Sequence, residues 1–202
     1  PQLVEFLQLA QVDYLIADQE HGTHADTLVA EVCALGRQVV FPVLIRPVDC
    51  ETSTIRRAID RGPCGLLLPT VDTTAQLDRV RDAIWMPPRG NRRPGGPGNY
   101  WVDNFAYDAW KTQVEDDFII LPQIESRVGL ANLDEIATHE ITTAMAIGPY
   151  DLSMDLGVGG QMDHPDLMAA TEQIRAAAET AGKSMWRIGH GPTMVREGYH
   201  FL

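Results

Sequence analysis

The sequence predicts an α/β protein, and more narrowly a (β/α)8 TIM barrel that continues beyond the amino end of this chain. Seven apolar segments of strand length alternate with segments of helical periodicity. The strand segments are almost continuously apolar, which is typical of parallel strands buried on both faces. A helix precedes the first visible strand, so we expect the barrel's own first strand upstream of residue 1. We expect residues 1–202 to form one incomplete barrel domain.

Each expected element has a local reason. The first helix has apolar residues at positions 3, 4, 6, 7 and 10, a helical spacing. Gly62 is expected to end a helix, and Thr73 with Gln76 reads as a capping box that starts the next one. The expected strands are 12–18, 39–47, 65–71, 118–125, 143–151, 183–188 and a last one beginning at 199–202. The expected helices are 1–11, 27–37, 52–62, 73–85, 105–114, 128–138, 165–181 and 192–198.

An open, doubly wound sheet is the alternative fold on the alternating pattern alone. The Gly-rich turn of a dinucleotide site, G-x-G-x-x-G, follows none of the predicted strands. The length of 202 residues is at the low end for a complete barrel.

Composition and charge exclude several classes of function. The net charge of −12 argues against nucleic acid or an anionic membrane as a partner. The sequence shows no apolar run of transmembrane length and no signal peptide at its start, so we expect a cytoplasmic protein. Three widely spaced cysteines suit a reducing compartment and packing roles better than a zinc site.

Polar side chains gather where the predicted strands end. In a TIM barrel the carboxyl ends of the strands form one rim, and that rim carries the chemistry. The residues at these ends are Asp18, Glu20, His21, Arg46, Gln123, Glu125 and Asp151. We therefore expect a single polar site at this rim.

Glu125 and Asp151 follow neighbouring predicted strands, so together they could hold a hard divalent cation through oxygen ligands. The alternative is that each carboxylate caps the next helix or pairs with an arginine such as Arg127.

His21 lies three residues after Asp18, and a carboxylate that orients an imidazole is the usual arrangement of a general base. The neighbouring His24 is expected to be merely solvated. Arg46 suits a substrate carboxylate or an enolate oxygen, because guanidinium binds such groups through two hydrogen bonds. A buried ion pair of Arg46 with Asp18 or Glu20 is the alternative.

The lysines argue against a Schiff-base aldolase, which needs a lysine inside the barrel. Only Lys111, in a helical stretch, and Lys183, at the start of a strand, are present. Metal-assisted enolisation is the mechanism that remains.

These residues lie in segments that resemble the metal-dependent (class II) pyruvate aldolases of the pyruvate/phosphoenolpyruvate barrel superfamily. Members of this family act on 4-hydroxy-2-oxo-heptanedioate and 2-keto-3-deoxy sugar acids. The resemblance spans the chain and is closest in "DYLIADQEHG", "VLIRPV", "LLLPTVDT", "PPRGNR", "LPQIESRVGLANLDEI" and "AIGPYDLSMDLG". By this resemblance a C-terminal segment beyond residue 202 is also missing from the chain.

The resemblance implies a role for each residue. Glu125 and Asp151 would bind a divalent cation, Mg, Mn or Co. His21, paired with Asp18, would be the acid/base, and Arg46 would hold pyruvate and stabilise its enolate. The remaining implied substrate contacts are Gln123, the backbone at Gly148, Pro149 and Tyr150, and Arg92.

The substrates implied are pyruvate, or a 2-oxo acid containing it, and an aldehyde, and the assembly implied is a homohexamer, a trimer of dimers. The family usually has Gly in place of Gln19 and a small residue in place of Tyr150, which leaves the identity of the aldehyde open. Alternative functions are another 2-oxo acid lyase or decarboxylase, an acyl-CoA lyase, or a non-catalytic binding or assembly homologue.

Overall fold

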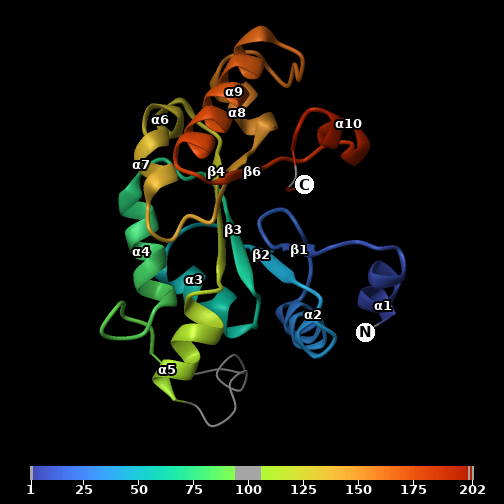
Figure 1. Cartoon of the computed structure of the whole chain (residues 1–202), viewed down its shortest axis with the longest axis vertical. Coiled ribbons are helices and arrows are strands. Elements are labelled where there is room, and N and C mark those ends of the chain that lie inside the picture. The colour runs from blue at the N-terminus through green and yellow to red at the C-terminus, as the bar shows by residue number, and fades with distance from the viewer. Residues whose placement is uncertain (1, 94–105, 200, 202) are drawn as a thin grey trace. The chain divides into compact units, whose positions relative to one another are not determined.

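The computed structural model describes residues 2–93, 106–199 and 201 (Figure 1). The chain divides into two compact units. Unit 1 contains Pro1–Leu67 and Arg79–Ile119, and unit 2 contains Leu68–Asp78 and Ile120–Leu202. Arg89, Arg92 and Arg93 lie in a loop rich in Pro and Gly, and the part of that loop at residues 94–105 lies outside the described residues.

Unit 1 is built on parallel strands in the order β1 (Leu15–Asp18), β2 (Val43–Arg46) and β3 (Gly65–Leu68). The register places Leu15 beside Val43 and Asp18 beside Arg46. The apolar residues of β2 and all of β3 are buried, as the uninterrupted apolar sequence predicted.

The helices of unit 1 are α1 (Gln2–Leu9), α2 (Asp26–Gln38), α3 (Thr52–Asp60), most of α4 (Thr74–Ile84) and α5 (Tyr107–Trp110), which continues as a π-helical turn over Lys111–Glu115. Helix α2 packs against β2, and α1 packs against α2. Helix α3 buries Ile55 and Ile59 completely. Gly62 follows it with a φ of 94°, a left-handed conformation that favours glycine, so the expected helix end is confirmed.

Unit 2 repeats the same architecture. Its parallel strands are β4 (Ile119–Ile124), β5 (Ala144–Ile147) and β6 (Ser184–Trp186), and Phe201 forms a single parallel bridge with Trp186. Its helices are α6 (Arg127–Ala131), α7 (Leu133–Thr138), α8 (Pro149–Asp155), α9 (Pro165–Thr180) and α10 (Gly191–Arg196). The prediction of an α/β fold with parallel strands is confirmed, with six strands described.

Several expected bounds differ from the structure, and single residues explain two of the differences. The strand expected over 143–151 ends at Ile147, and Asp151 lies in the first turn of α8. Pro149 explains this boundary, because proline is favoured at the first position of a helix and cannot donate to a strand ladder. The single helix expected over 128–138 is divided at Asn132, whose side-chain amide donates to the carbonyls of Asp72 (2.8 Å) and Val128 (3.1 Å).

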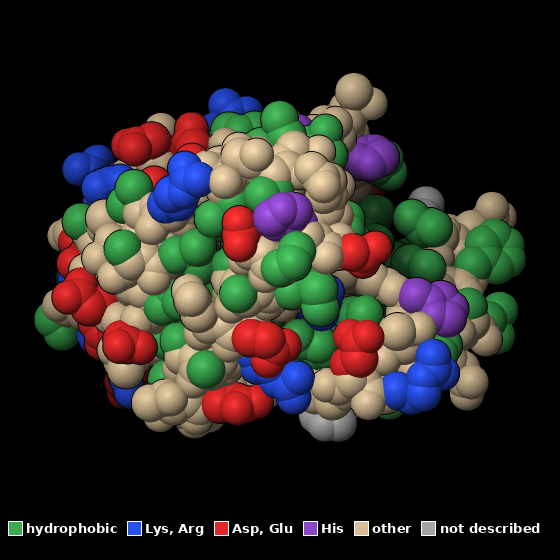
Figure 2. Space-filling view, turned by 90° about the horizontal axis from the view of Figure 1, so that it is seen from above, with side chains coloured by type: hydrophobic (Ala, Val, Ile, Leu, Met, Phe, Trp, Pro, Cys, Tyr) green, Lys and Arg blue, Asp and Glu red, His purple; other side chains and the backbone are tan. Residues whose placement is uncertain are grey.

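The surface carries both signs of charge. On the face shown in Figure 2, acidic and basic side chains are interspersed, with acidic ones in the majority. Among the described residues, no helix combines the length and the hydropathy that a membrane crossing requires. The expectation of one domain over residues 1–202 stays a prediction.

Candidate active site

Unit 1 carries a cluster of charged side chains at the carboxyl ends of β1 and β2. Arg46 Nε donates to Asp18 Oδ1 at 2.9 Å, and Arg46 Nη2 donates to Asp18 Oδ2. Arg46 Nη1 lies 3.2 Å from Glu20 Oε2. The parallel register makes this possible, because it places Asp18 and Arg46 directly beside each other. The guanidinium is thus held in one plane by two carboxylates.

Asp18 is ionised in this cluster. Burial alone would raise its pKa, but hydrogen bonds from Arg46 and from the backbone N–H groups of His21 and Glu20 outweigh burial and lower the pKa below the usual value. The cluster therefore presents two carboxylates and one guanidinium in fixed positions.

His21 lies beside this cluster, but its imidazole does not make the expected contact with Asp18. The Asp18 carboxylate accepts hydrogen bonds from Arg46 and from the backbone N–H of His21 (3.3 Å). The His21 imidazole has its Nε2 3.8 Å from Glu20 Oε2, and its side chain is 66% exposed. An exposed imidazole beside a carboxylate remains accessible to a substrate or a water.

Unit 2 carries a buried carboxylate, Glu125, which follows the last residue of β4 and is 6% exposed. The backbone N–H of Thr70 donates to Glu125 Oε2 at 2.8 Å, and the Thr70 hydroxyl donates to the same oxygen at 2.9 Å. Thr70 was not among the residues predicted from the sequence. The only sequence signal for it is a hydroxyl residue just after a strand.

Gly148 lies against Glu125 from the neighbouring strand. Its N–H donates to the carbonyl of Ile124 at 3.2 Å, and a Cβ on Gly148 would come within 2.0 Å of Glu125 Oε1. A glycine is therefore required where the carboxylate lies. Asp151, three residues later, is exposed in the first turn of α8, and the Tyr150 side chain is also exposed, at 63%.

Gln123 is a buried residue with an unmet hydrogen-bonding capacity. It is 3% exposed, and its Oε1 has no hydrogen-bond partner among the described residues. Buried polar atoms are normally paired, and an exception in a native structure points to a missing water, ion or ligand. Gln123 lies on β4, two residues before Glu125.

The unit 2 side chains suit a hard divalent cation. The carboxylates of Glu125 and Asp151 and the amide oxygen of Gln123 are oxygen donors, which such cations prefer. No group of three or more His, Cys, Asp or Glu side chains suited to a metal was found in the described part of the chain. Mg²⁺ commonly binds through one or two carboxylates and completes its shell with water and substrate oxygens, so the two carboxylates are a sufficient protein contribution.

Arg92, in the segment between α4 and α5, does not lie at the carboxyl ends of β1 and β2. Arg92 is 2% exposed, its Nη2 is 3.2 Å from Asp60 Oδ1, and its guanidinium lies 5.0 Å from the centroid of the Trp110 ring. Asp60 is the last residue of α3 and precedes β3, so Arg92 lies at the amino end of that strand. Asp18 and Arg46 lie at the carboxyl ends of β1 and β2. The structure does not bring Arg92 to them within unit 1.

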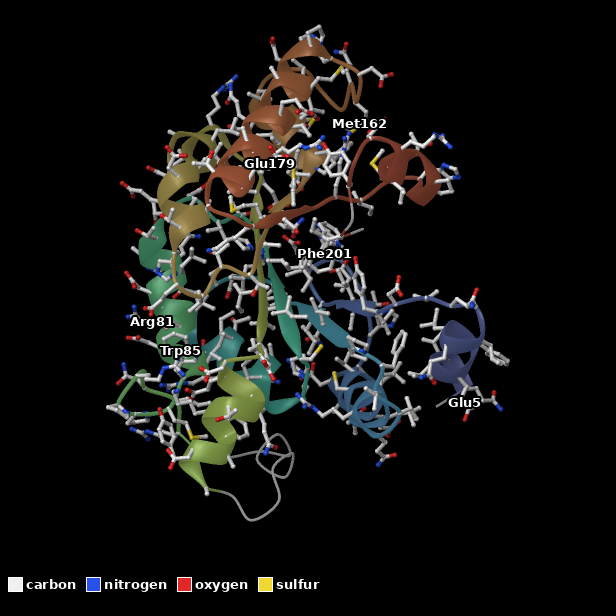
Figure 3. All side chains as sticks on the ribbon, in the orientation of Figure 1. Glu5, Arg81, Trp85, Met162, Glu179 and Phe201 are labelled. Carbon is white, nitrogen blue, oxygen red and sulfur yellow. The ribbon has the colours of Figure 1, made fainter. Side chains whose placement is uncertain are left out.

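Arg89, in the same loop, is also engaged. Its guanidinium stacks 3.8 Å from the centroid of the ring of Trp85, which is labelled in Figure 3, and pairs with Glu115 (3.1 Å) and Asp116 (2.8 Å). The described part of the loop is thus anchored to unit 1 by arginines.

Substituting Arg92 should therefore lower the stability of the fold rather than act first on catalysis. We expect Arg92→Ala to lower the free energy of unfolding by about 1–3 kcal/mol, because the stack on Trp110 and the pair with Asp60 are both lost. Urea unfolding measures this, with Arg93→Ala, an exposed neighbour, as the control. A variant of unchanged stability whose KM rises only for carboxylate-bearing aldehydes would instead support the substrate contact predicted from the sequence.

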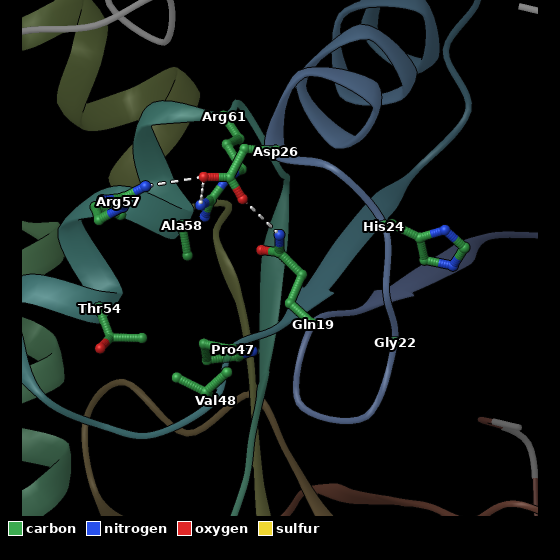
Figure 4. A pocket seen from close by; sticks show the side chains of 10 residues that line it. All are labelled: Gln19, Gly22, His24, Asp26, Pro47, Val48, Thr54, Arg57, Ala58 and Arg61. Carbon is green, nitrogen blue, oxygen red and sulfur yellow. Dashed lines mark hydrogen bonds and ion pairs between the residues drawn. The ribbon is translucent and has the colours of Figure 1, made fainter.

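A cleft of about 300 Å³ opens in unit 1 just beyond Asp18 and Arg46 (Figure 4). Asp26 lines it and pairs with Arg57 (2.9 Å) and Arg61 (2.6 Å), while Gln19 Nε2 donates to Asp26 Oδ1 at 3.1 Å. Side chains alternate along a strand, so Gln19 is directed away from Asp18, towards the helices. The cleft belongs to the helix-covered side of the strands.

Asp26 should make the stability of the protein depend on acid pH. Hydrogen bonds from Arg61 and Arg57 lower the pKa of Asp26 to about 2. A lowered carboxyl pKa stabilises the fold above the unfolded value near 4, and this contribution is lost as the pH falls towards 2.

We expect Asp26→Asn to be less stable than the wild type at neutral pH, by less than about 1 kcal/mol because the side chains are solvent-screened. The difference between the two proteins should shrink from pH ~4 downwards. Urea unfolding at a series of pH values measures it, with Glu31→Gln, on the exposed side of α2, as the control. A difference that does not vary with pH would contradict this role of the ionised carboxylate.

Comparison with known proteins places the chain in a family. Residues 1–196 match the model of the HpcH/HpaI aldolase/citrate lyase family. A hydroxypyruvate/pyruvate aldolase from Pseudomonas aeruginosa is 34% identical over 200 residues, which cover 97% of this chain and 73% of that protein. A 2-keto-3-deoxy-L-rhamnonate aldolase from Shigella boydii serotype 4 (strain Sb227) is 34% identical over 196 residues, covering 96% and 73%.

Comparison of structures leads to the same family as comparison of sequences. The crystal structure of the HpcH/HpaI aldolase from Desulfitobacterium hafniense DCB-2 superposes with a TM-score of 0.91 at 26% identity, covering all of this chain and 80% of that one. The match extends over both units and over every strand that carries a predicted site residue. The chain therefore belongs to the HpcH/HpaI aldolase/citrate lyase family.

Proposed function

We propose that the protein is a divalent-metal-dependent pyruvate aldolase, which cleaves or forms 4-hydroxy-2-oxo acids. The observation that carries the proposal is the buried group at the end of β4, where Glu125 is held by Thr70 and the oxygen of Gln123 is unpaired. A site that buries a carboxylate and leaves an amide oxygen unmet is suited to a cation and an oxygen-rich substrate. The family likeness supports a (β/α)8 barrel as the complete fold.

Glu125 and Asp151 would hold the cation, and Gln123 would lie beside it. When bound, a divalent cation supplies Lewis acidity to the carboxylate and keto oxygens of a 2-oxo acid. The backbone at Gly148, Pro149 and Tyr150 would receive the substrate carboxylate through the N–H of Tyr150. Pro149 has no N–H and that of Gly148 donates to Ile124, whereas an N–H in the first turn of a helix has no partner within the helix. The metal would be Mg, Mn or Co.

His21 and Arg46 of unit 1 supply the proton transfer and the positive charge in the proposal. In the cleavage direction His21, directly or through a water, removes the proton of the 4-hydroxyl group. The C3–C4 bond breaks, its electron pair forms the enolate of pyruvate, and the 4-carbon leaves as an aldehyde. Arg46 stabilises the enolate charge, and Asp18 and Glu20 keep its guanidinium in place. A proton then returns to C3 and gives pyruvate.

The described contacts favour a metal-dependent aldolase over an imine-forming one, and an aldolase over an acyl-CoA lyase. Lys183 Nζ donates to the carbonyls of Ala137 and His139 (3.0 Å for the latter), just before β6, which is a structural use and not that of an imine-forming lysine. An acyl-CoA lyase would need basic side chains for the nucleotide phosphates, but Arg89 and Arg92 are paired with acidic residues. The homohexamer and the cytoplasmic location stay predictions.

The test is release of pyruvate from a panel of 4-hydroxy-2-oxo acids, including 2-keto-3-deoxy sugar acids. We expect release with Mn²⁺, Mg²⁺ or Co²⁺, loss of release with a chelator and recovery when the metal is restored. A chain that binds the metal but cleaves none of the panel would contradict the proposed aldol reaction and favour another lyase activity.

A further inference from the structure

The loop between β3 and α4 is bonded to the end of β4 at three consecutive residues. Thr70 donates twice to Glu125 Oε2, from its N–H (2.8 Å) and its hydroxyl (2.9 Å). The N–H of Val71 donates to the carbonyl of Gln123 at 3.0 Å. Asp72 Oδ1 accepts a hydrogen bond from the hydroxyl of Ser126. The loop therefore contacts Glu125 itself and the residues on both sides of it.

Ser126 extends this connection into the next helix. Its hydroxyl oxygen accepts a hydrogen bond from the N–H of Gly129 at 3.0 Å and so caps the start of α6. The position of Glu125 is consequently determined from two sides. The strand β4 fixes its backbone before it, and the capped helix fixes its backbone after it.

The backbone of Thr70 is strained in the conformation that makes these contacts. Its φ is 45°, in the left-handed region that a β-branched residue rarely adopts. Such conformations persist where the surroundings enforce them, and they concentrate at functional sites. The strain turns both the N–H and the hydroxyl of Thr70 towards one carboxylate oxygen.

Gln76 enforces the conformation. Its Nε2 donates to the carbonyl of Thr70 at 2.8 Å, and its Oε1 accepts from the N–H groups of Asp72 (2.8 Å) and Thr73 (3.0 Å). The bond from Thr73 to Gln76 is the one that the sequence predicted as part of a capping box. The structure adds that the same side chain closes the loop around Thr70.

We propose that Thr70 is a positioning residue that fixes the rotamer of Glu125 for cation binding. Two donors hold Oε2, while Oε1 lies on the side of Gly148, where any larger residue would meet it. The inference rests on the proposed role of Glu125 as a metal ligand. Hydrogen bonds to a ligating carboxylate orient it, and losing one typically lowers metal affinity or activity about 10–100-fold.

The test compares Thr70→Val with Thr70→Ser in the full chain. Valine keeps the shape and the backbone N–H but removes the hydroxyl donor, whereas serine retains the donor. The probe is Mn²⁺, whose dissociation constant is measured by calorimetry, and the melting temperature is measured in chelator. Thr73→Val is the matched control, because Thr73 is in the same loop and is exposed.

We expect Thr70→Val to raise the Mn²⁺ dissociation constant by about 10-fold or more. Thr70→Ser and Thr73→Val should bind Mn²⁺ as the wild type does, and the Thr70 variants should melt near the wild-type temperature in chelator. Thr70→Ala removes the same donor with less bulk and should show the same loss of affinity. It replaces the valine variant if that one does not fold.

Two results would overturn the proposal. Wild-type Mn²⁺ affinity in Thr70→Val would show that the hydroxyl does not position Glu125. A lower melting temperature in chelator for both Thr70→Val and Thr70→Ser would show a purely structural role. Glu125→Gln separates these from a failure of the proposed function, since undiminished Mn²⁺ affinity in that variant would remove Glu125 from the metal site altogether.

Discussion

Replacing Glu125 by glutamine, or Asp151 by asparagine, is expected to abolish the dependence of pyruvate release on a divalent metal. Each change removes one negative charge from a site that offers two carboxylates, so the loss of metal affinity should exceed the roughly 10–100-fold typical of an outer partner. Glutamine can still accept the hydrogen bonds of Thr70, so the fold around β4 should be preserved. Calorimetric titration with Mn²⁺ and steady-state rates at a series of metal concentrations measure the effect.

The exposed Asp163→Asn, in the segment between α8 and α9, is the matched control, because it removes the same charge from unit 2 without touching β4 or the first turn of α8. Activity and metal affinity near the wild-type values in either the Glu125 or the Asp151 variant would show that the cation site is placed wrongly.

His21→Ala is expected to slow aldol cleavage by about 10²–10⁴-fold, the usual consequence of losing a general acid/base. The imidazole is exposed beside Glu20, so its removal should leave the packing of unit 1 unchanged. The effect should appear in kcat, and the dissociation constant for Mn²⁺ should not change. Stopped-flow or coupled assays of pyruvate release at saturating substrate measure it.

His24→Ala is the control, since His24 is an exposed histidine of the same loop and lines the cleft around Asp26. A large loss in His24→Ala together with a mild one in His21→Ala would reverse the assignment. Equal and small losses in both would leave proton transfer to another group or to water.

The strands could be predicted from the sequence because their residues are buried on both faces. Runs such as Val43–Arg46, Gly65–Leu68 and Ala144–Ile147 are apolar at nearly every position, and no exposed element tolerates that composition. Their exact ends could not be predicted so well. The last residues of the expected strand at 143–151 are instead the start of α8, because Pro149 is favoured at the first position of a helix.

The polar residues that follow the strand ends could also be identified from the sequence, because the carboxyl ends of parallel strands are where such a fold places its chemistry, and the roles given to these residues stay predictions. Arg92 shows the limit of that reasoning. The sequence places Arg92 in a loop rich in Pro and Gly, but the sequence carries no signal for the direction that this loop takes. Burial against Trp110 and the pair with Asp60 place Arg92 at the amino end of β3.

The sequence by itself therefore determined the alternation of strands and helices, the family and the set of polar residues at the strand ends, since all of these follow from local periodicity and ordered motifs. Tertiary structure alone decided which polar groups are partners. Asp18 is three residues from His21 in the chain, yet the parallel register places Arg46 beside it, and the guanidinium pairs with the carboxylate through two hydrogen bonds. Thr70 and Glu125 are 55 positions apart. Their contact depends on how a loop and a neighbouring strand pack, and no local pattern in the sequence contains that information.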